Sequence, residues 1–91
     1  MNLTGEQEEL LRLAIEKWGK EAQIRMAVEE CGELLSALMK LYRSRVTEED
    51  VIDEVADNIL MNEQLAMIYG KDKVLARIKF KMDRVKTRLN A

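Results

Sequence analysis

The chain has 91 residues, of which 47% are hydrophobic and 35% are charged, a balance typical of a globular protein rather than a disordered one. It contains no proline, only four glycines and no histidine. Aromatic residues make up only 4% of the chain, which argues against a β-sandwich or barrel, and the absence of histidine excludes histidine-dependent zinc sites and catalytic triads. We therefore predict one all-α domain covering residues 1–91.

Three features predict the location of the protein. The lone Cys31 cannot form an internal disulfide, which is compatible with a reducing compartment. The first residues are acidic, unlike a signal peptide, and no apolar run approaches the roughly 18 residues of a membrane span. We therefore expect a soluble, cytoplasmic protein with no membrane partner.

Charge is divided unevenly along the chain. Residues 1–70 contain 15 acidic and 7 basic residues, a net charge of −8, whereas residues 71–91 contain 2 acidic and 8 basic residues, a net charge of +6. An acidic body joined to a basic segment could bind a cation and a polyanion side by side. Ordinary solvated helix surfaces would give the same asymmetry.

Apolar residues spaced by three and four predict four helices. The first is expected over residues 4–17, with Thr4 as its N-cap. Gly19 marks a break, and the second helix is expected over residues 21–42. Cys31 lies on the apolar arc of this second helix, so we predict that it is buried.

The third predicted helix begins at Thr47, where Thr-Glu-Glu-Asp resembles a capping box, and it ends before Gly70, at a position suited to a left-handed residue. The fourth covers residues 71–89. Short connections predict an antiparallel four-helix, bundle-like chain. Because so short a chain has a modest core of its own, we expect it to assemble with other copies into a homodimer or homotetramer.

Two acidic pairs stand out. Glu30 and Glu33 are three residues apart on the second predicted helix, as are Glu54 and Asp57 on the third. Residues at this spacing share a helix face, and none of the four has a lysine or arginine three or four residues away. Antiparallel packing would bring the pairs together, and Mg²⁺ is their natural partner. A solvated acidic face is the alternative interpretation.

Both pairs belong to longer motifs. Residues 29–33 read EECGE, an EExxE motif, and residues 54–57 read EVAD, an ExxD motif, with 20 residues between them. Residues 18–23 (WGKEAQ) precede the first motif, and residues 81–84 (KMDR) follow the second. Over nearly its whole length the chain resembles the MazG-like, all-α nucleoside triphosphate pyrophosphohydrolases.

The resemblance implies an enzyme. Its reaction would be Mg²⁺-dependent hydrolysis of a (deoxy)nucleoside triphosphate between the α and β phosphates, giving the monophosphate and pyrophosphate, with Mn²⁺ able to replace Mg²⁺. By the same resemblance four carboxylates would hold the metal, and a fifth would assist them. These residues are Glu30, Glu33, Glu54 and Asp57 as ligands, and Glu29 as the assisting group.

Five further residues are candidates for binding the substrate. By the resemblance, Lys81 and Arg84 would meet phosphate oxygens, although some relatives carry the arginine one position later. Trp18 could stack on a base, but a tryptophan on an apolar helix stripe is more often a core residue. Gln23 and Asn58 could hydrogen-bond the base or a phosphate, and they could equally serve a helix surface or cap.

Two other functions compete with the enzyme. The chain could be a non-catalytic helical interaction module whose acidic face binds a protein. Its basic last helix could also contact nucleic acid phosphates, but the acidic body would repel the rest of a duplex, so we expect no nucleic acid polymer as a partner. The sequence leaves open which base or sugar is preferred, and whether the nucleotide is a standard or a damaged one.

Overall fold

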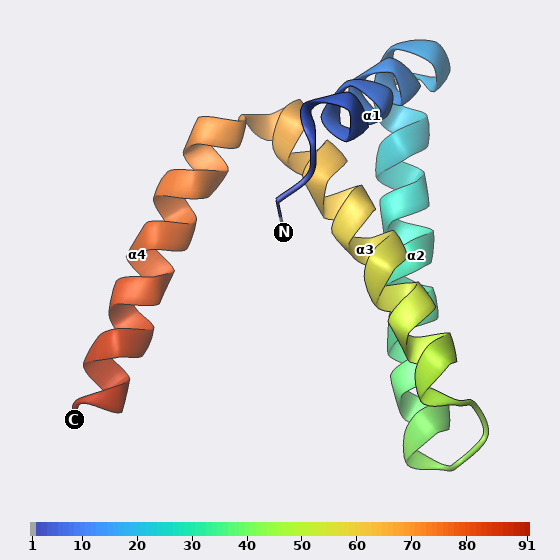
Figure 1. The fold of residues 1–91 in the computed structure, drawn as a ribbon, viewed down its shortest axis with the longest axis vertical. Coiled ribbons are helices and arrows are strands. Elements are labelled where there is room, and N and C mark those ends of the chain that lie inside the picture. The colour runs from blue at the N-terminus through green and yellow to red at the C-terminus, as the bar shows by residue number, and fades with distance from the viewer. Residues whose placement is uncertain (1) are drawn as a thin grey trace.

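The computed structural model describes residues 2–91, which form four α-helices: α1 (Gly5–Trp18), α2 (Lys20–Tyr42), α3 (Glu48–Tyr69) and α4 (Lys71–Leu89) (Figure 1). These residues contain no strand, so the all-α prediction is confirmed. Each helix begins and ends within one residue of its predicted range. Across the described residues, no helix is both long enough and apolar enough to span a membrane.

Two threonines fix the starts of α1 and α3. The Thr4 hydroxyl accepts a hydrogen bond from the Gln7 backbone N–H at 3.1 Å, and the Gln7 side chain accepts one from the Thr4 N–H at 2.9 Å. Thr47 and Asp50 form the same reciprocal capping box, at 3.3 and 2.8 Å. The backbone N–H and the hydroxyl of Thr47 both donate hydrogen bonds to the Asp50 carboxylate. These bonds favour the ionised form and lower the pKa of Asp50, and the bond from the N–H has the larger effect.

Single glycines redirect the chain at two places. Gly19 connects α1 to α2 and Gly70 connects α3 to α4, with φ angles of 91° and 116°. Side chains with a Cβ rarely adopt positive φ, so glycine is required for so short a connection. Gly70 has the positive φ predicted for it, but its ψ of 105° lies outside the left-handed helical region.

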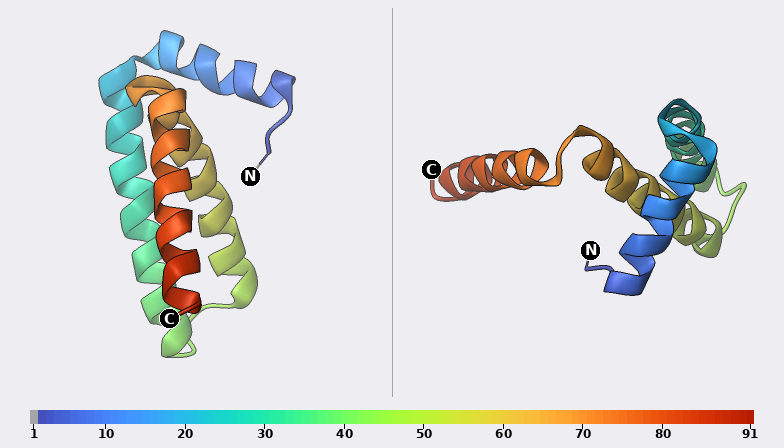
Figure 2. Two further views of the ribbon diagram at one scale, coloured as in Figure 1. Left: turned by 90° about the vertical axis from the view of Figure 1, so that its left-hand side faces the viewer. Right: turned by 90° about the horizontal axis from the view of Figure 1, so that it is seen from above.

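The helices α2 and α3 form an antiparallel pair that packs along its length, and α1 crosses one end of this pair (Figures 1 and 2). Helix α4 starts at the same end but runs away from the pair. Among the four described helices, α3 is the one whose backbone α4 approaches, close to Gly70. The bundle-like packing therefore lies in α1 to α3, and α4 projects from it as an arm.

Two polar contacts anchor α1. The Gln64 side chain on α3 is 2% exposed, and its Nε2 donates a hydrogen bond to the Leu11 carbonyl oxygen at 3.1 Å. About one turn earlier on α1, Glu8 pairs with the Lys71 ammonium at 3.0 Å and raises the pKa of that lysine. These contacts hold α1 across the end of the α2–α3 pair, next to the point where α4 begins.

Much apolar surface stays exposed in one chain. The buried apolar residues of the described range are Ala27 and Ala37. The prediction that Cys31 is buried is wrong, because this cysteine lines an uncovered groove of about 630 Å³ between α2 and α3. Trp18, for which a core position is the commoner role, is 59% exposed. Large apolar side chains are also exposed along α2 and α4, including Val28, Leu35, Ile78, Phe80 and Met82.

Candidate metal centre

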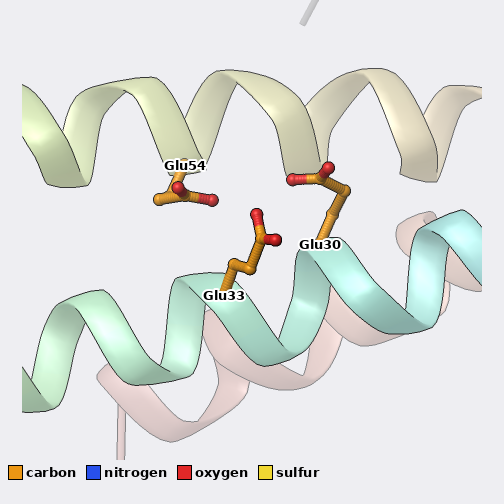
Figure 3. A group of neighbouring side chains, drawn as sticks. All are labelled: Glu30, Glu33 and Glu54. Carbon is orange, nitrogen blue, oxygen red and sulfur yellow. The ribbon is translucent and has the colours of Figure 1, made fainter.

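Three glutamates converge between α2 and α3 (Figure 3). Glu30 and Glu33 project from successive turns of α2, and Glu54 projects toward them from α3. One carboxylate oxygen from each residue lies within 4.8 Å of the others. The i, i+3 spacing and the antiparallel packing of two acidic helices together produce this acidic cluster of Glu30, Glu33 and Glu54.

The other two carboxylates of the motifs lie outside the acidic cluster. Asp57 is exposed, but its negative charge still acts on Glu30 and Glu54 and raises the pKa of both. Glu29 is exposed on α2 and is not among the residues that shift those pKa values. The structure thus places Asp57 at the edge of the cluster and Glu29 outside it.

The acidic cluster contains polar atoms that lack partners. The Oε2 atoms of Glu30 and Glu54 are shielded from solvent, and neither has a hydrogen-bond partner within residues 2–91. The ion pairs of that range involve Arg12 and Lys71 with acids of α1, not with the cluster. A buried carboxylate oxygen without a donor is costly. The cluster is therefore suited to a cation or to a proton.

Burial and crowding both act on the ionisation of the cluster. Desolvation is the largest cause that raises the pKa of Glu30 and of Glu54, and the negative charge of Glu33 is the second. Asp57 raises both values further, and Asp53 adds to the effect on Glu54. Each cause disfavours the ionised form in the absence of a cation.

We expect the metal-free protein to melt at a higher temperature as the pH falls from neutrality toward about 4.5, the ordinary pKa of these glutamates. The pKa values of Glu30 and Glu54 are higher in the folded chain than in the unfolded one. As the pH falls, the folded state therefore binds protons before the unfolded state does, and the free energy of unfolding increases. This increase is lost when the pH rises again through the folded-state pKa values. Melting followed by circular dichroism across this range measures the effect.

Glu30→Gln provides the control for this pH dependence, because the variant lacks one of the two carboxyls that take up a proton. Its melting temperature should depend less steeply on pH than that of the original chain. The lowered pKa of Asp50 acts in the opposite direction, but only below its ordinary value of 3.8, outside the range tested. An identical pH dependence in the variant and the original chain would contradict the attribution to the cluster.

A hollow of about 330 Å³ adjoins the acidic cluster, and its lining includes Glu33, Glu54 and Lys40. Lys40 is not among the residues predicted from the sequence to bind substrate, since both basic candidates lie in the last helix. It lies seven residues after Glu33 on α2, so the two share a helix face. That spacing is the signal that would have found it. The lining also includes Asp50, so its net charge is negative, and an anionic ligand would need a bound cation beside Lys40 to offset the carboxylates.

Asn58 lies between the two helices. Its side-chain Nδ2 donates hydrogen bonds to the backbone carbonyl oxygen of Glu30 at 2.9 Å and to that of Glu54 at 2.8 Å. The amide donors of Asn58 are thus engaged by the protein itself. This bond between two helices is neither the helix-surface nor the capping role considered from the sequence, and the substrate-binding role of Asn58 stays a prediction.

Trp18 and Gln23 meet at the turn between α1 and α2. Together with Ala22 and Met26 they line a hollow of about 390 Å³. Gln23 is 3% exposed, and its Nε2 points to the Met26 sulfur at 3.8 Å. Since Gln23 precedes Glu30 by seven residues on α2, this hollow lies on the same face as the acidic cluster, about 10 Å away along the helix axis.

The basic candidates lie elsewhere. Lys81 and Arg84 are exposed on α4, which runs away from the α2–α3 pair (Figure 2). Within one chain the structure does not bring them to the acidic cluster. Arg84 instead lines a shallow hollow formed by residues of α4 alone.

Comparisons of the chain with protein-family models, with curated proteins and with solved structures found no match. The likeness to MazG-like enzymes therefore rests on the motifs of the sequence, and it stays a prediction.

Proposed function

We propose that the chain is a Mg²⁺-dependent nucleoside triphosphate pyrophosphohydrolase, like the MazG-like enzymes that its motifs resemble. The observation that carries the proposal is the convergence of Glu30, Glu33 and Glu54 from the two motif-bearing helices. Two oxygens of this acidic cluster are buried without partners, and carboxylate oxygens are the donors that Mg²⁺ prefers. The donor set therefore fits a hard divalent cation.

Glu30, Glu33 and Glu54 would hold the metal, and the exposed Asp57 would join them at the edge of the acidic cluster. Bound there, Mg²⁺ or Mn²⁺ would offset the negative charge and supply an activated water and contacts for phosphate oxygens. The triphosphate would lie in the hollow beside Glu33 and Glu54. Lys40 would donate hydrogen bonds to its phosphate oxygens, which favours binding of the more highly charged nucleotides.

The hollow at Trp18 and Gln23 would receive the nucleobase. It lies on the same face of α2 as the acidic cluster but on the side opposite Lys40, so the base and the phosphates would occupy successive positions along this helix. The exposed Trp18 ring offers a surface for stacking. The base would thus be bound mainly by its flat face, and catalysis would depend on positioning and charge neutralisation.

A panel of standard and modified triphosphates, incubated with Mg²⁺, with Mn²⁺ or with a chelator, tests the proposal. The expected products are a monophosphate and pyrophosphate, formed only when a divalent cation is present. Release of a diphosphate and inorganic phosphate would contradict the assigned bond. Comparison across the panel would also identify the preferred base and sugar.

We infer that α4 completes the site from a second copy of the chain. The basic arm carries a net charge of +6 and the body −8, so the arm of one copy complements the body of another. Exposed apolar residues on α4, such as Ile78 and Met82, would be covered at the same time. Lys81 and Arg84 would then reach the phosphates bound beside the partner's acidic cluster.

Light scattering at micromolar concentration should show a dimer or a tetramer. The physical reason is the large exposed apolar surface of α2 and α4 in one chain, which water disfavours. Raising the salt concentration should weaken the assembly, because part of the attraction is between opposite charges. A monomer of 10.6 kDa that still hydrolyses nucleotides would contradict the inference.

The exposed apolar faces of α2 and α4 also favour a second candidate function. A non-catalytic interaction module would bind a protein partner through these faces and the acidic body. Its melting temperature would be indifferent to millimolar Mg²⁺, whereas a metal site raises the melting temperature by mass action. Indifference to Mg²⁺, together with no hydrolysis in the nucleotide panel, would favour the module over the enzyme.

A further inference from the structure

Within residues 2–91, one hydrogen bond joins α2 to α3, and Asn58 makes it. The amide Nδ2 donates to the Glu30 carbonyl oxygen, 28 positions earlier in the chain, at 2.9 Å. The same nitrogen donates to the Glu54 carbonyl oxygen, one turn earlier on its own helix, at 2.8 Å. The side chain is partly buried between the helices. One amide therefore links the backbones of the two residues whose carboxylates face each other.

The link has a geometric consequence for the acidic cluster. Each carboxylate projects from the Cα atom bonded to one of these two carbonyl groups. A shift of α2 along α3 would break the Asn58–Glu30 bond and would separate the Glu30 and Glu54 oxygens at the same time. The bond therefore fixes the register at the level where the carboxylates converge.

No other hydrogen bond of the described helices joins α2 to α3. No salt bridge of residues 2–91 crosses from α2 to α3, and apolar contacts are non-directional. The negative charges on the two helices repel each other when no cation is bound. Without a directional bond, the pair would relieve that repulsion by sliding or separating locally.

We propose that Asn58 is a positioning residue that holds the acidic cluster in the arrangement that binds a divalent cation. It acts through the backbones of Glu30 and Glu54 and does not itself bind the cation. This inference rests on the proposed function, because it assumes that the cluster takes up the ion. Groups that orient metal ligands typically change affinity by about 10- to 100-fold when they are removed.

The test compares Asn58→Ala with Asn62→Ala. Asn62 lies one turn later on α3, is exposed, and makes no side-chain hydrogen bond within residues 2–91. Titration calorimetry with Mn²⁺ and no nucleotide, well below the melting temperature, should show an affinity about 10-fold or more weaker for Asn58→Ala. Asn62→Ala should bind as the original chain does.

The stoichiometry of binding separates positioning from general stability. A partly unfolded variant would bind fewer ions per chain with the original dissociation constant, and this result would overturn the inference. A mispositioned site would bind the original number of ions with a larger dissociation constant. Hydrolysis by the Asn58→Ala variant should accordingly recover in part when the Mg²⁺ concentration is raised.

Asn58→Ser removes only the bond between the helices. A serine hydroxyl can bond the carbonyl four residues earlier on its own helix, as the Thr87 hydroxyl does with the Asp83 carbonyl at 3.0 Å, but it is too short to reach α2. If Asn58→Ala does not fold, the Mn²⁺ titration is performed with Asn58→Ser instead. If neither variant folds, Asn58 has a purely structural role and the inference is overturned.

The same titrations distinguish this inference from the proposed function. If the original chain and Asn62→Ala bind no Mn²⁺, the metal site itself is wrong. If both bind and the Asn58 variants bind equally well, the site stands and only the positioning role falls.

Discussion

Replacing Glu33 by Gln is expected to abolish Mg²⁺-dependent hydrolysis and to leave the metal-free protein as stable as before, or slightly more stable. Glu33 is the neighbour that most strongly disfavours ionisation of both Glu30 and Glu54. Its loss removes a proposed metal ligand and also relieves the repulsion that only the cation offsets. Because its side chain is exposed, the change removes little packing. Nucleotide assays and chelator-treated melting curves measure the two effects.

Asp57→Asn carries the same expectation, and Glu63→Gln provides the control. Glu63 also lacks a lysine or arginine one turn away on its helix, but its carboxylate lies near Lys71 at the far end of α3. Its replacement should leave hydrolysis unchanged. Activity at the original level in both Glu33→Gln and Asp57→Asn would refute the assignment of the metal site.

Lys81→Ala should lower kcat/KM by about 10- to 150-fold while Mg²⁺ affinity without nucleotide stays nearly unchanged. The range corresponds to the roughly 1.5–3 kcal/mol of a charge-assisted hydrogen bond to phosphate. Lys86→Ala, on another face of α4, should change kcat/KM by about twofold or less, because exposed substitutions usually fall within about 0.5 kcal/mol. Both lysines are exposed in one chain, so the pair controls for the general loss of positive charge.

Mixing an inactive variant with an impaired one tests whether Lys81 acts across copies of the chain. Assemblies of Lys81→Ala with Glu33→Gln would contain some sites with an intact acidic cluster from one copy and an intact lysine from the other. Partial recovery of activity on mixing is expected. Equal losses in Lys81→Ala and Lys86→Ala would instead mean that α4 is a diffuse basic surface. The roles given to Lys81 and Arg84 would then be withdrawn.

The elements of the fold could be predicted because their signals are local. The side chains of Thr4 and Thr47 bond to residues three positions away, and Gly19 and Gly70 break helices through their own backbone angles. The direction of α4 depends on how the chain leaves Gly70, which helical periodicity does not determine. The exposure of Cys31 could not be predicted for the same reason, since an apolar stripe does not indicate what covers it.

The candidate site likewise has parts that could be predicted from the sequence and parts that could not. Helical spacing and antiparallel packing were sufficient to bring Glu30 and Glu33 toward Glu54. The bond from Asn58 to the Glu30 carbonyl joins residues 28 positions apart, and no spacing rule identifies such a pair. Lys40 could have been identified from its position seven residues after Glu33, but the hollow that both residues line also depends on Val46 from the loop after α2.

Gly70 alone joins α4 to α3, so a rotation at this glycine would move the far end of α4 much more than its first turn. Its 19 residues span about 28 Å, so a rotation of about 10° at the glycine displaces the far end by about 5 Å and Lys81 by about 3 Å. The first turn barely moves and keeps its ion pair with Glu8. A Cβ added at Gly70 would lie 3.3 Å from the Lys73 side chain, at a residue whose φ is 116°. Such a substitution would stiffen or redirect α4. Small changes in the backbone angles of Gly70 would therefore produce larger displacements at the last turn of α4, which carries Lys86 and Arg88.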